Sequence, residues 1–293
     1  MAHPLESAYS KLIRAKDHID DFEKRMTALA ENDAYQPVHE MNLQAGKYRI
    51  TLPLPPPSTY LGTILGDIAQ NLRSSLDHLV WAVVVSNRSG VEPQKANQIF
   101  FPILDAPEDF EKARIKRLLN YLTYEQRALI EVAQPYMRRD KSRRHGFSFL
   151  RDLSNADKHQ TAPVLVYGVL PEDKPVIGDP VFRNCGELID PHWVIAHGGL
   201  YHGVPLAEFQ FTWLRPDSRV DMELEITVQP ALREGEHMTP LFPALDNILI
   251  NAFRLIRQFE GFFPPVPERD GLLERLFPKA VARWRARAAA RQG

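Results

Sequence analysis

The feature that most constrains the fold of this chain is a long run of apolar residues at helical spacing, without glycine or proline from Asp67 to Val85. At about 100° per residue, one broad face of this helix is apolar. That face consists of Leu61, Ile64, Leu65, Ile68, Leu72, Leu76, Leu79 and Val83. The prolines at 55–57 cannot continue a helix backwards, so Ser58 or Thr59 is expected to cap its start. Such a face predicts a helical bundle.

A narrow polar row lies on the opposite side of the same helix, with spacings of four, three, four and three residues. The row consists of Asp67, Asn71, Ser74, His78 and Trp81. A solvated face usually carries lysine and glutamate, and this stretch contains neither, so the row is either a site or an unusual wet face. Arg73 and Asp77 lie between the two faces, at the four-residue spacing of a helical ion pair.

A second predicted helix, Gly146 to His159, repeats this arrangement. Its polar row consists of Ser148, Asp152, Asn155 and His159. If the two rows face each other in a bundle, carboxylates, amides and imidazoles converge, and bundle cores are a usual place for such sites. Carboxylate and imidazole also suit zinc, manganese or iron. The Glu-x-x-His pattern of bundle metal sites is absent from both rows, so we predict no metal and no cofactor.

The order of apolar patterns along the chain predicts the fold class. Helical spacing marks 4–33, 56–159 and 240–263, and a period of two marks β structure in 36–54 and 160–230. Because helices flank a run of strands without βαβ alternation, we predict an α+β fold. It would be one domain over 1–293, with about five or six bundled helices, an antiparallel sheet of four to six strands and a basic C-terminal tail, 272–293. The 36–54 hairpin is expected at the sheet edge.

Three short stretches within the helical part attract specific predictions. Ile99 to Ile103 is an apolar plug expected to pack on the bundle, and Thr123 with Gln126 predicts a capping box. A loop further on is rich in basic residues and is either solvated or a phosphate-binding patch. Its basic residues are Arg138, Arg139, Lys141, Arg143 and Arg144.

Composition and motif content exclude several classes of protein. The chain of 293 residues is 44% hydrophobic and 25% charged with a net charge of −1, which is ordinary globular composition. The single cysteine, Cys185, excludes an internal disulfide and fits a reducing cytoplasm. The charged N-terminus predicts no signal peptide, and no run approaches the roughly 20 apolar residues of a membrane span. No Walker loop, Rossmann fingerprint, GxSxG or HExxH occurs. We expect a cytoplasmic protein without a membrane partner.

The stretch from Arg73 to His78 fits Arg-x4-His and is similar to the signature of HEPN-type ribonucleases, helical-bundle proteins of toxin, phage-defence and RNA-processing systems. The resemblance implies metal-independent RNA cleavage by the 2′-hydroxyl, commonly in a cleft between two protomers, and hence RNA and a second copy as partners. It implies that Arg73 neutralises the phosphate while His78 acts as acid or base. Supporting residues would be Asp67, Asn71, Ser74, Asp77, Asp152, Asn155 and His159. Phosphate contacts would come from Arg138, Arg139, Arg143 and Arg144.

A broader resemblance rests on four segments: NLRSSLDHLVWAVV, FFPI, AQPY and LSNADKHQT. They look like a group of bacterial proteins of unassigned function, over most of the chain, and this resemblance implies no activity. Three hypotheses follow for function. The first is the ribonuclease. The second is a non-catalytic binding or interaction protein, in which a buried polar network fixes the packing of the bundle. The third is a small-molecule enzyme with a converging Asp/Asn/His pocket closed by the sheet.

Overall fold

The computed structural model describes residues 3–30, 37–53, 59–89, 96–137, 146–159, 165–169, 176–193, 200–201, 205–225, 229–234, 237–265, 269–278 and 281–282. The chain divides into two compact units, where the sequence predicts one domain. The helical unit comprises Met1–Asp21, Ile64–Thr161 and Leu245–Gly293, and the β unit comprises Phe22–Thr63 and Ala162–Ala244. Helices and antiparallel strands occupy separate parts of the chain, which confirms the predicted α+β class.

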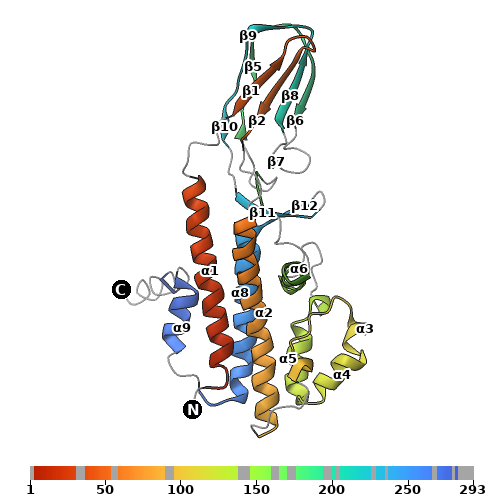
Figure 1. Cartoon of the computed structure of the whole chain (residues 1–293), viewed down its shortest axis with the longest axis vertical. Coiled ribbons are helices and arrows are strands. Elements are labelled where there is room, and N and C mark those ends of the chain that lie inside the picture. The colour runs from red at the N-terminus through yellow and green to blue at the C-terminus, as the bar shows by residue number, and fades with distance from the viewer. Residues whose placement is uncertain are drawn as a thin grey trace, which may run out of the picture. The chain divides into compact units, whose positions relative to one another are not determined.

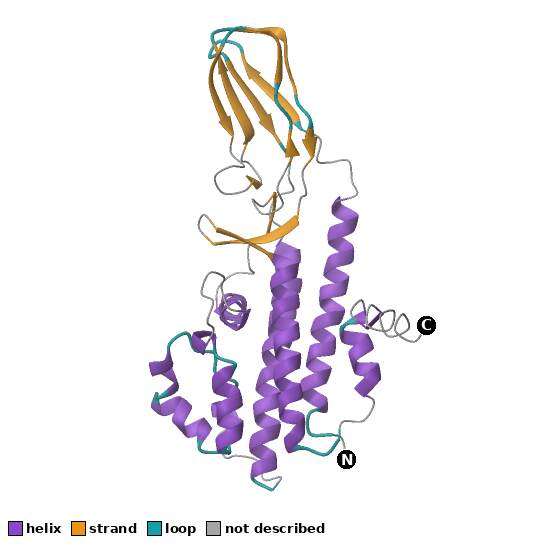
Figure 2. Ribbon diagram, turned by 180° about the vertical axis from the view of Figure 1, so that it is seen from behind, coloured by secondary structure: helices purple, strands orange, loops and turns teal. Residues whose placement is uncertain are grey.

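Three long helices form the frame of the helical unit: α1 (Glu6–Ala30), α2 (Thr59–Asn87) and α8 (Leu241–Phe259). The division into units falls within them, because residues 22–30, 59–63 and 241–244 belong to the β unit. They run side by side in both views (Figure 1, Figure 2). The predicted apolar face of α2 is buried throughout, from Leu61 to Val83. Because each such side chain contributes roughly 1.5–3 kcal/mol on burial, this face is a principal source of the bundle's stability.

Shorter helices pack on this frame. They are α3 (Pro107–Phe110), α4 (Ala113–Leu119), α5 (Tyr124–Val132), α6 (Gly146–His159) and α9 (Arg269–Leu276), with 3-10 turns η2 (Ala96–Gln98), η3 (Pro135–Met137) and η5 (Glu260–Phe262). The capping box predicted at α5 is confirmed, because Thr123 Oγ1 accepts from Gln126 N at 3.3 Å while Gln126 Oε1 accepts from Thr123 N at 3.0 Å. Asn87, at the end of α2, also donates to Gln126 Oε1 at 2.7 Å and ties the two helices together.

The apolar segment from Ile99 to Ile103 packs on the bundle, as predicted. Phe101 is fully buried, and its ring meets that of Phe147 in α6 edge to face, with 5.7 Å between the centroids. Ile99 and Ile103 are buried beside it. This segment crosses from η2 to α3 and brings its backbone against the polar residues of α2.

The β unit contains short antiparallel strands, which within the described residues form four small sheets instead of the single predicted sheet. The strands are β1 (Val38–Asn42), β2 (Lys47–Thr51), β3 (Leu165–Val169), β4 (Val176–Ile177), β5 (Val181–Cys185), β6 (Leu188–Trp193), β7 (Leu200–Tyr201), β8 (Pro205–Phe211), β9 (Leu214–Asp221), β10 (Leu224–Glu225), β11 (Gln229–Glu234) and β12 (His237–Pro240). Their orders are β1-β2-β8-β6, β12-β11-β3-β7, β10-β4 and β5-β9. The early hairpin β1-β2 adds an edge, as expected.

Two of these sheets pack face to face around aromatic rings. Phe182 of β5 lies 5.3 Å from Phe209 and 5.1 Å from Phe211 of β8, measured between ring centroids. Val220 N of β9 donates to the hydroxyl of Tyr48 in β2 at 3.3 Å. The β5-β9 pair therefore covers the inner face of β1-β2-β8-β6, and polar residues of β8 alternate onto the outer face.

Candidate functional site

The central polar feature of the helical unit is a clamp that α2 places on the backbone of Phe101. Arg73 Nη2 donates to the carbonyl oxygen of Phe101 at 2.6 Å. Asp77 Oδ1 accepts from the amide nitrogen of Phe101 at 2.8 Å. The two side chains also form the predicted helical ion pair, at 3.4 Å. One pair of charges on α2 thus satisfies both backbone groups of a fully buried residue, which would otherwise lose water without compensation.

The surroundings of this clamp set the electrostatics of Arg73. Its side chain is 14% exposed and that of Asp77 is 31% exposed. Burial lowers the pKa of the Arg73 guanidinium, the carboxylate of Asp77 raises it, and the charge of Arg151 lowers it again. Arg73 remains a cation in any physiological medium.

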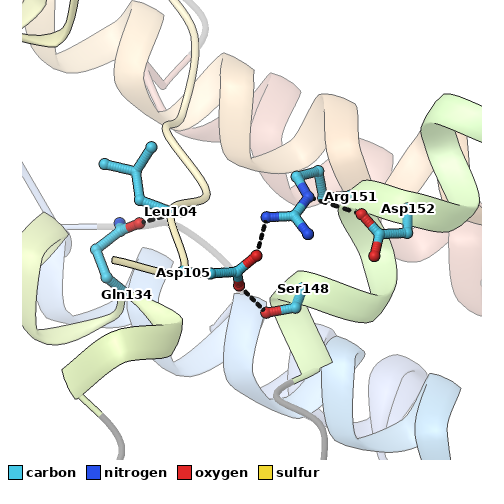
Figure 3. Close-up of polar contacts among 6 residues, drawn as sticks. All are labelled: Leu104, Asp105, Gln134, Ser148, Arg151 and Asp152. Atoms are coloured by element: carbon cyan, nitrogen blue, oxygen red, sulfur yellow. Dashed lines mark hydrogen bonds and ion pairs between the residues drawn. The ribbon is translucent and has the colours of Figure 1, made fainter. Parts of the chain in front are cut away.

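A second group of contacts fastens the next residues of the same segment (Figure 3). Asp105 accepts from Ser148 Oγ at 2.6 Å and from Arg151 of α6, and Arg151 Nε donates to Asp152 at 2.7 Å. The hydrogen bond to Asp152 is the main reason that the pKa of Arg151 is raised. Leu104 N donates to Gln134 Oε1 at 3.0 Å. The backbone from 101 to 105 is therefore held by α2, by α6 and by Gln134 just after α5.

The first polar row of α2 turns to a different neighbour, helix α1. His78 Nδ1 lies 2.7 Å from Ser7 Oγ, and Lys11 Nζ donates to Asn71 Oδ1 at 3.4 Å. Asn71 Nδ2 also donates to the backbone carbonyl of Asp67 at 2.8 Å. Of the other members of the row, Ser74 accepts from Gln70 Nε2 at 3.5 Å, the side chain of Asp67 is exposed and Trp81 is half-buried. Asn71 and His78 of this row therefore contact α1.

The two predicted polar rows therefore have different partners. The second row reaches the 104–105 segment through Ser148, while Asp152 pairs with its neighbour Arg151. Asn155 is exposed, and the side chain of His159 lies outside the described residues. The basic loop with Arg138, Arg139, Arg143 and Arg144 also lies outside them.

The predicted catalytic pair is divided between these two settings. Arg73 faces Phe101 and Asp77, whereas His78 faces Ser7. Residues five apart on a helix differ by about 140° in direction, which accounts for the divergence. The catalytic assignment stays a prediction from the Arg-x4-His motif.

Several residues of this network were not singled out by the sequence patterns. They are Ser7, Lys11, Asp105, Gln134 and Arg151. Asp105 stands in a segment without periodicity, so no local signal identifies its partners. For Arg151 there was a local signal, because it directly precedes Asp152 in the sequence and the two side chains carry opposite charges. Among the described residues, no group of three or more His, Cys, Asp or Glu side chains is arranged to hold a metal ion.

No protein-family model, no curated protein and no solved structure matches this chain. The described helices include none that is long and apolar enough to cross a membrane.

Proposed function

We propose that this chain is a non-catalytic binding protein, in which the polar residues of the helical unit fix the packing of the 101–105 segment. The observation that carries the proposal is the clamp of Arg73 and Asp77 on Phe101. Both charged groups are occupied by backbone atoms of a fully buried residue. Fully satisfied polar networks of this kind can specify one arrangement of a core without chemistry.

The energetics of the clamp support this function over the ribonuclease. To neutralise a phosphate, Arg73 would have to release the carbonyl of Phe101 and its contact with Asp77. Leaving a buried carbonyl without a donor costs about 1–3 kcal/mol. The side chain of Arg73 is also only 14% exposed, so an RNA strand has little access to it. A structural role for Arg73 requires no change in its contacts with Phe101 and Asp77.

The small-molecule enzyme is supported less well, for a related reason. That hypothesis needs the polar rows of α2 and α6 to converge on one pocket. The contacts instead direct His78 to α1 and Ser148 to the 104–105 segment. We therefore propose binding, with the polar network as scaffold.

The test compares stability with RNA cleavage in the variants Arg73→Ala, Arg73→Lys and His78→Ala. We expect Arg73→Ala to lower the midpoint of urea unfolding clearly, with a smaller loss for Arg73→Lys. We expect wild type and all variants to leave a fluorescent RNA oligonucleotide intact in the presence of a chelator. Metal-independent cleavage by wild type, abolished in both alanine variants at unchanged stability, would instead establish the ribonuclease.

A further inference from the structure

A serine and a histidine meet where α1 contacts α2, and neither belongs to the clamp on Phe101. Ser7 Oγ lies 2.7 Å from His78 Nδ1. Ser7 is exposed in the first turn of α1, and His78 is half-buried. A hydroxyl within hydrogen-bond reach of an imidazole is the arrangement that activates a serine as a nucleophile. The proposed binding function makes no use of this pair.

The positions of the protons in this pair follow from the partners that each group has. A serine hydroxyl carries one proton and rotates toward an acceptor. Among the residues that the structure describes, His78 Nδ1 is the acceptor within hydrogen-bond distance of Ser7 Oγ. The hydroxyl proton is therefore assigned to this bond and the ring proton to Nε2. In this tautomer the imidazole accepts a proton from the serine, as a general base must.

The backbone of Ser7 adds a donor beside the hydroxyl. Unlike the amides of Glu6 and Tyr9, the amide of Ser7 donates to no backbone carbonyl among the described residues. It belongs to the same residue as the nucleophilic oxygen, so it lies next to the oxygen that becomes negative when an ester carbonyl is attacked. A backbone N–H in this position stabilises the oxyanion of acyl transfer.

Lys11 supplies a positive charge one helical turn from Ser7, since residues four apart on a helix have Cβ atoms about 5–6 Å apart. Lys11 Nζ donates to the neutral amide of Asn71 at 3.4 Å. Within the described part of the chain Lys11 forms no ion pair, either with the exposed Asp67 or with Glu6, which leaves α1 about 140° away from it. The cluster combines a nucleophile, a base and a cation, so it favours a substrate with an anionic group.

We propose that Ser7 is a nucleophile activated by His78, and that it takes the acyl group of an activated ester that carries an anionic group. Ser7 Oγ attacks the carbonyl carbon of the ester while its proton passes to His78 Nδ1. The bond from this carbon to the leaving oxygen then breaks, the leaving oxygen takes the proton, and an ester of Ser7 remains. The chain is modified once per molecule. The proposal therefore adds a covalent modification site to the binding function and does not depend on the clamp.

Acetylation by p-nitrophenyl acetate and by its ring-carboxylated relative tests the site, with the modified residues located by tandem mass spectrometry. Ser10 is the internal control, because it is exposed on the same helix and no imidazole contacts it within the described residues. We expect the acetyl ester to form at least about a hundred times faster on Ser7 than on Ser10, since a positioned general base contributes about 10²–10⁴-fold. Equal rates on the two serines, or acetyl groups on Lys11 without an ester on Ser7, would overturn the proposal.

Two substitutions test the roles of the neighbours. His78→Ala should slow the acetylation of Ser7 at least about a hundredfold, toward the rate of Ser10. Wild type should react about fivefold faster with the carboxylated ester than with the neutral one, and Lys11→Gln should remove this preference. A Ser7 rate that is equal in wild type and in folded His78→Ala, or a preference that survives Lys11→Gln, contradicts the assigned roles. The ratio between Ser7 and Ser10 is measured in wild type, so it decides the proposal even where a variant does not fold.

Discussion

Replacing Arg73 with alanine is the sharpest test of the clamp on Phe101. The substitution removes the donor that lies 2.6 Å from the Phe101 carbonyl and the ion-pair partner of Asp77. It leaves the backbone carbonyl of a residue with 0% exposure without its donor. Asp77 keeps the amide of Phe101 but loses the neighbouring positive charge.

The expected loss follows from these contacts. A hydrogen bond between a charged donor and a buried acceptor contributes about 1.5–3 kcal/mol. The ion pair adds less than a fully buried one, because Asp77 is 31% exposed and water screens part of the interaction. We expect Arg73→Ala to lower the free energy of unfolding by about 2–4 kcal/mol. Because Asp77 acts through the same backbone residue, the double variant with Asp77→Asn should lose less than the sum of the single losses.

Urea unfolding followed by far-UV circular dichroism measures this loss as a lower midpoint at unchanged slope. The matched control is Arg275→Ala in the same unit. Its guanidinium pairs with Asp17 at 3.3 Å, but the side chains are 58% and 42% exposed. An exposed pair of this kind contributes about 0–1 kcal/mol. A loss in Arg73→Ala no greater than that in Arg275→Ala would refute the clamp as a stabilising element.

Three further predictions concern other parts of the fold. In thermal melts, Gly46→Ala should destabilise the protein by about 1–3 kcal/mol, because Gly46 has a positive φ and the added Cβ would lie against a backbone oxygen. The control is Gly271→Ala, whose Cβ would meet nothing within 4 Å; it should be neutral or stabilising. Thr123→Ala should lower the free energy of unfolding by about 0.5–2 kcal/mol through loss of the α5 cap, and a midpoint equal to that of wild type would contradict this. Burial, with the charge of Glu131, raises the pKa of Tyr136 to about 12. This folded-state pKa exceeds the unfolded value of about 10. The contribution of Tyr136 to the free energy of unfolding is therefore fully present below about pH 10 and is lost as the pH rises toward 12. Tyr136→Phe should therefore lose less stability than wild type over that range, in urea titrations at several pH values.

Features encoded locally could be predicted from the sequence. The apolar face of α2 follows from helical spacing alone, and all its members from Leu61 to Val83 are buried. The capping box of Thr123 and Gln126 depends on residues three apart. The ion pair of Arg73 and Asp77 spans one helical turn. The alternation of apolar and polar residues in the β segments predicted the α+β class. The division into small sheets could not be predicted, because it depends on pairings between strands that are distant in the sequence.

The candidate site depended on information that a local pattern does not contain. A polar row shows that one side of a helix differs from the other, but its neighbour is set by tertiary packing. His78 meets a serine 71 positions away in the sequence, and Arg73 meets a carbonyl 28 positions away. The motif Arg-x4-His counts residues along the chain and takes no account of the direction in which each side chain leaves the helix.

The division of the chain into two interleaved units has a consequence for biosynthesis. The β unit combines Phe22–Thr63 with Ala162–Ala244, and the helical unit needs Leu245–Gly293 in addition to its two earlier segments. During translation the N-terminal strands must therefore wait for their partners, and the helical core cannot close before α8 has left the ribosome. Long-range closure of this kind slows folding and leaves apolar faces exposed on the nascent chain. No single truncation therefore yields either unit intact.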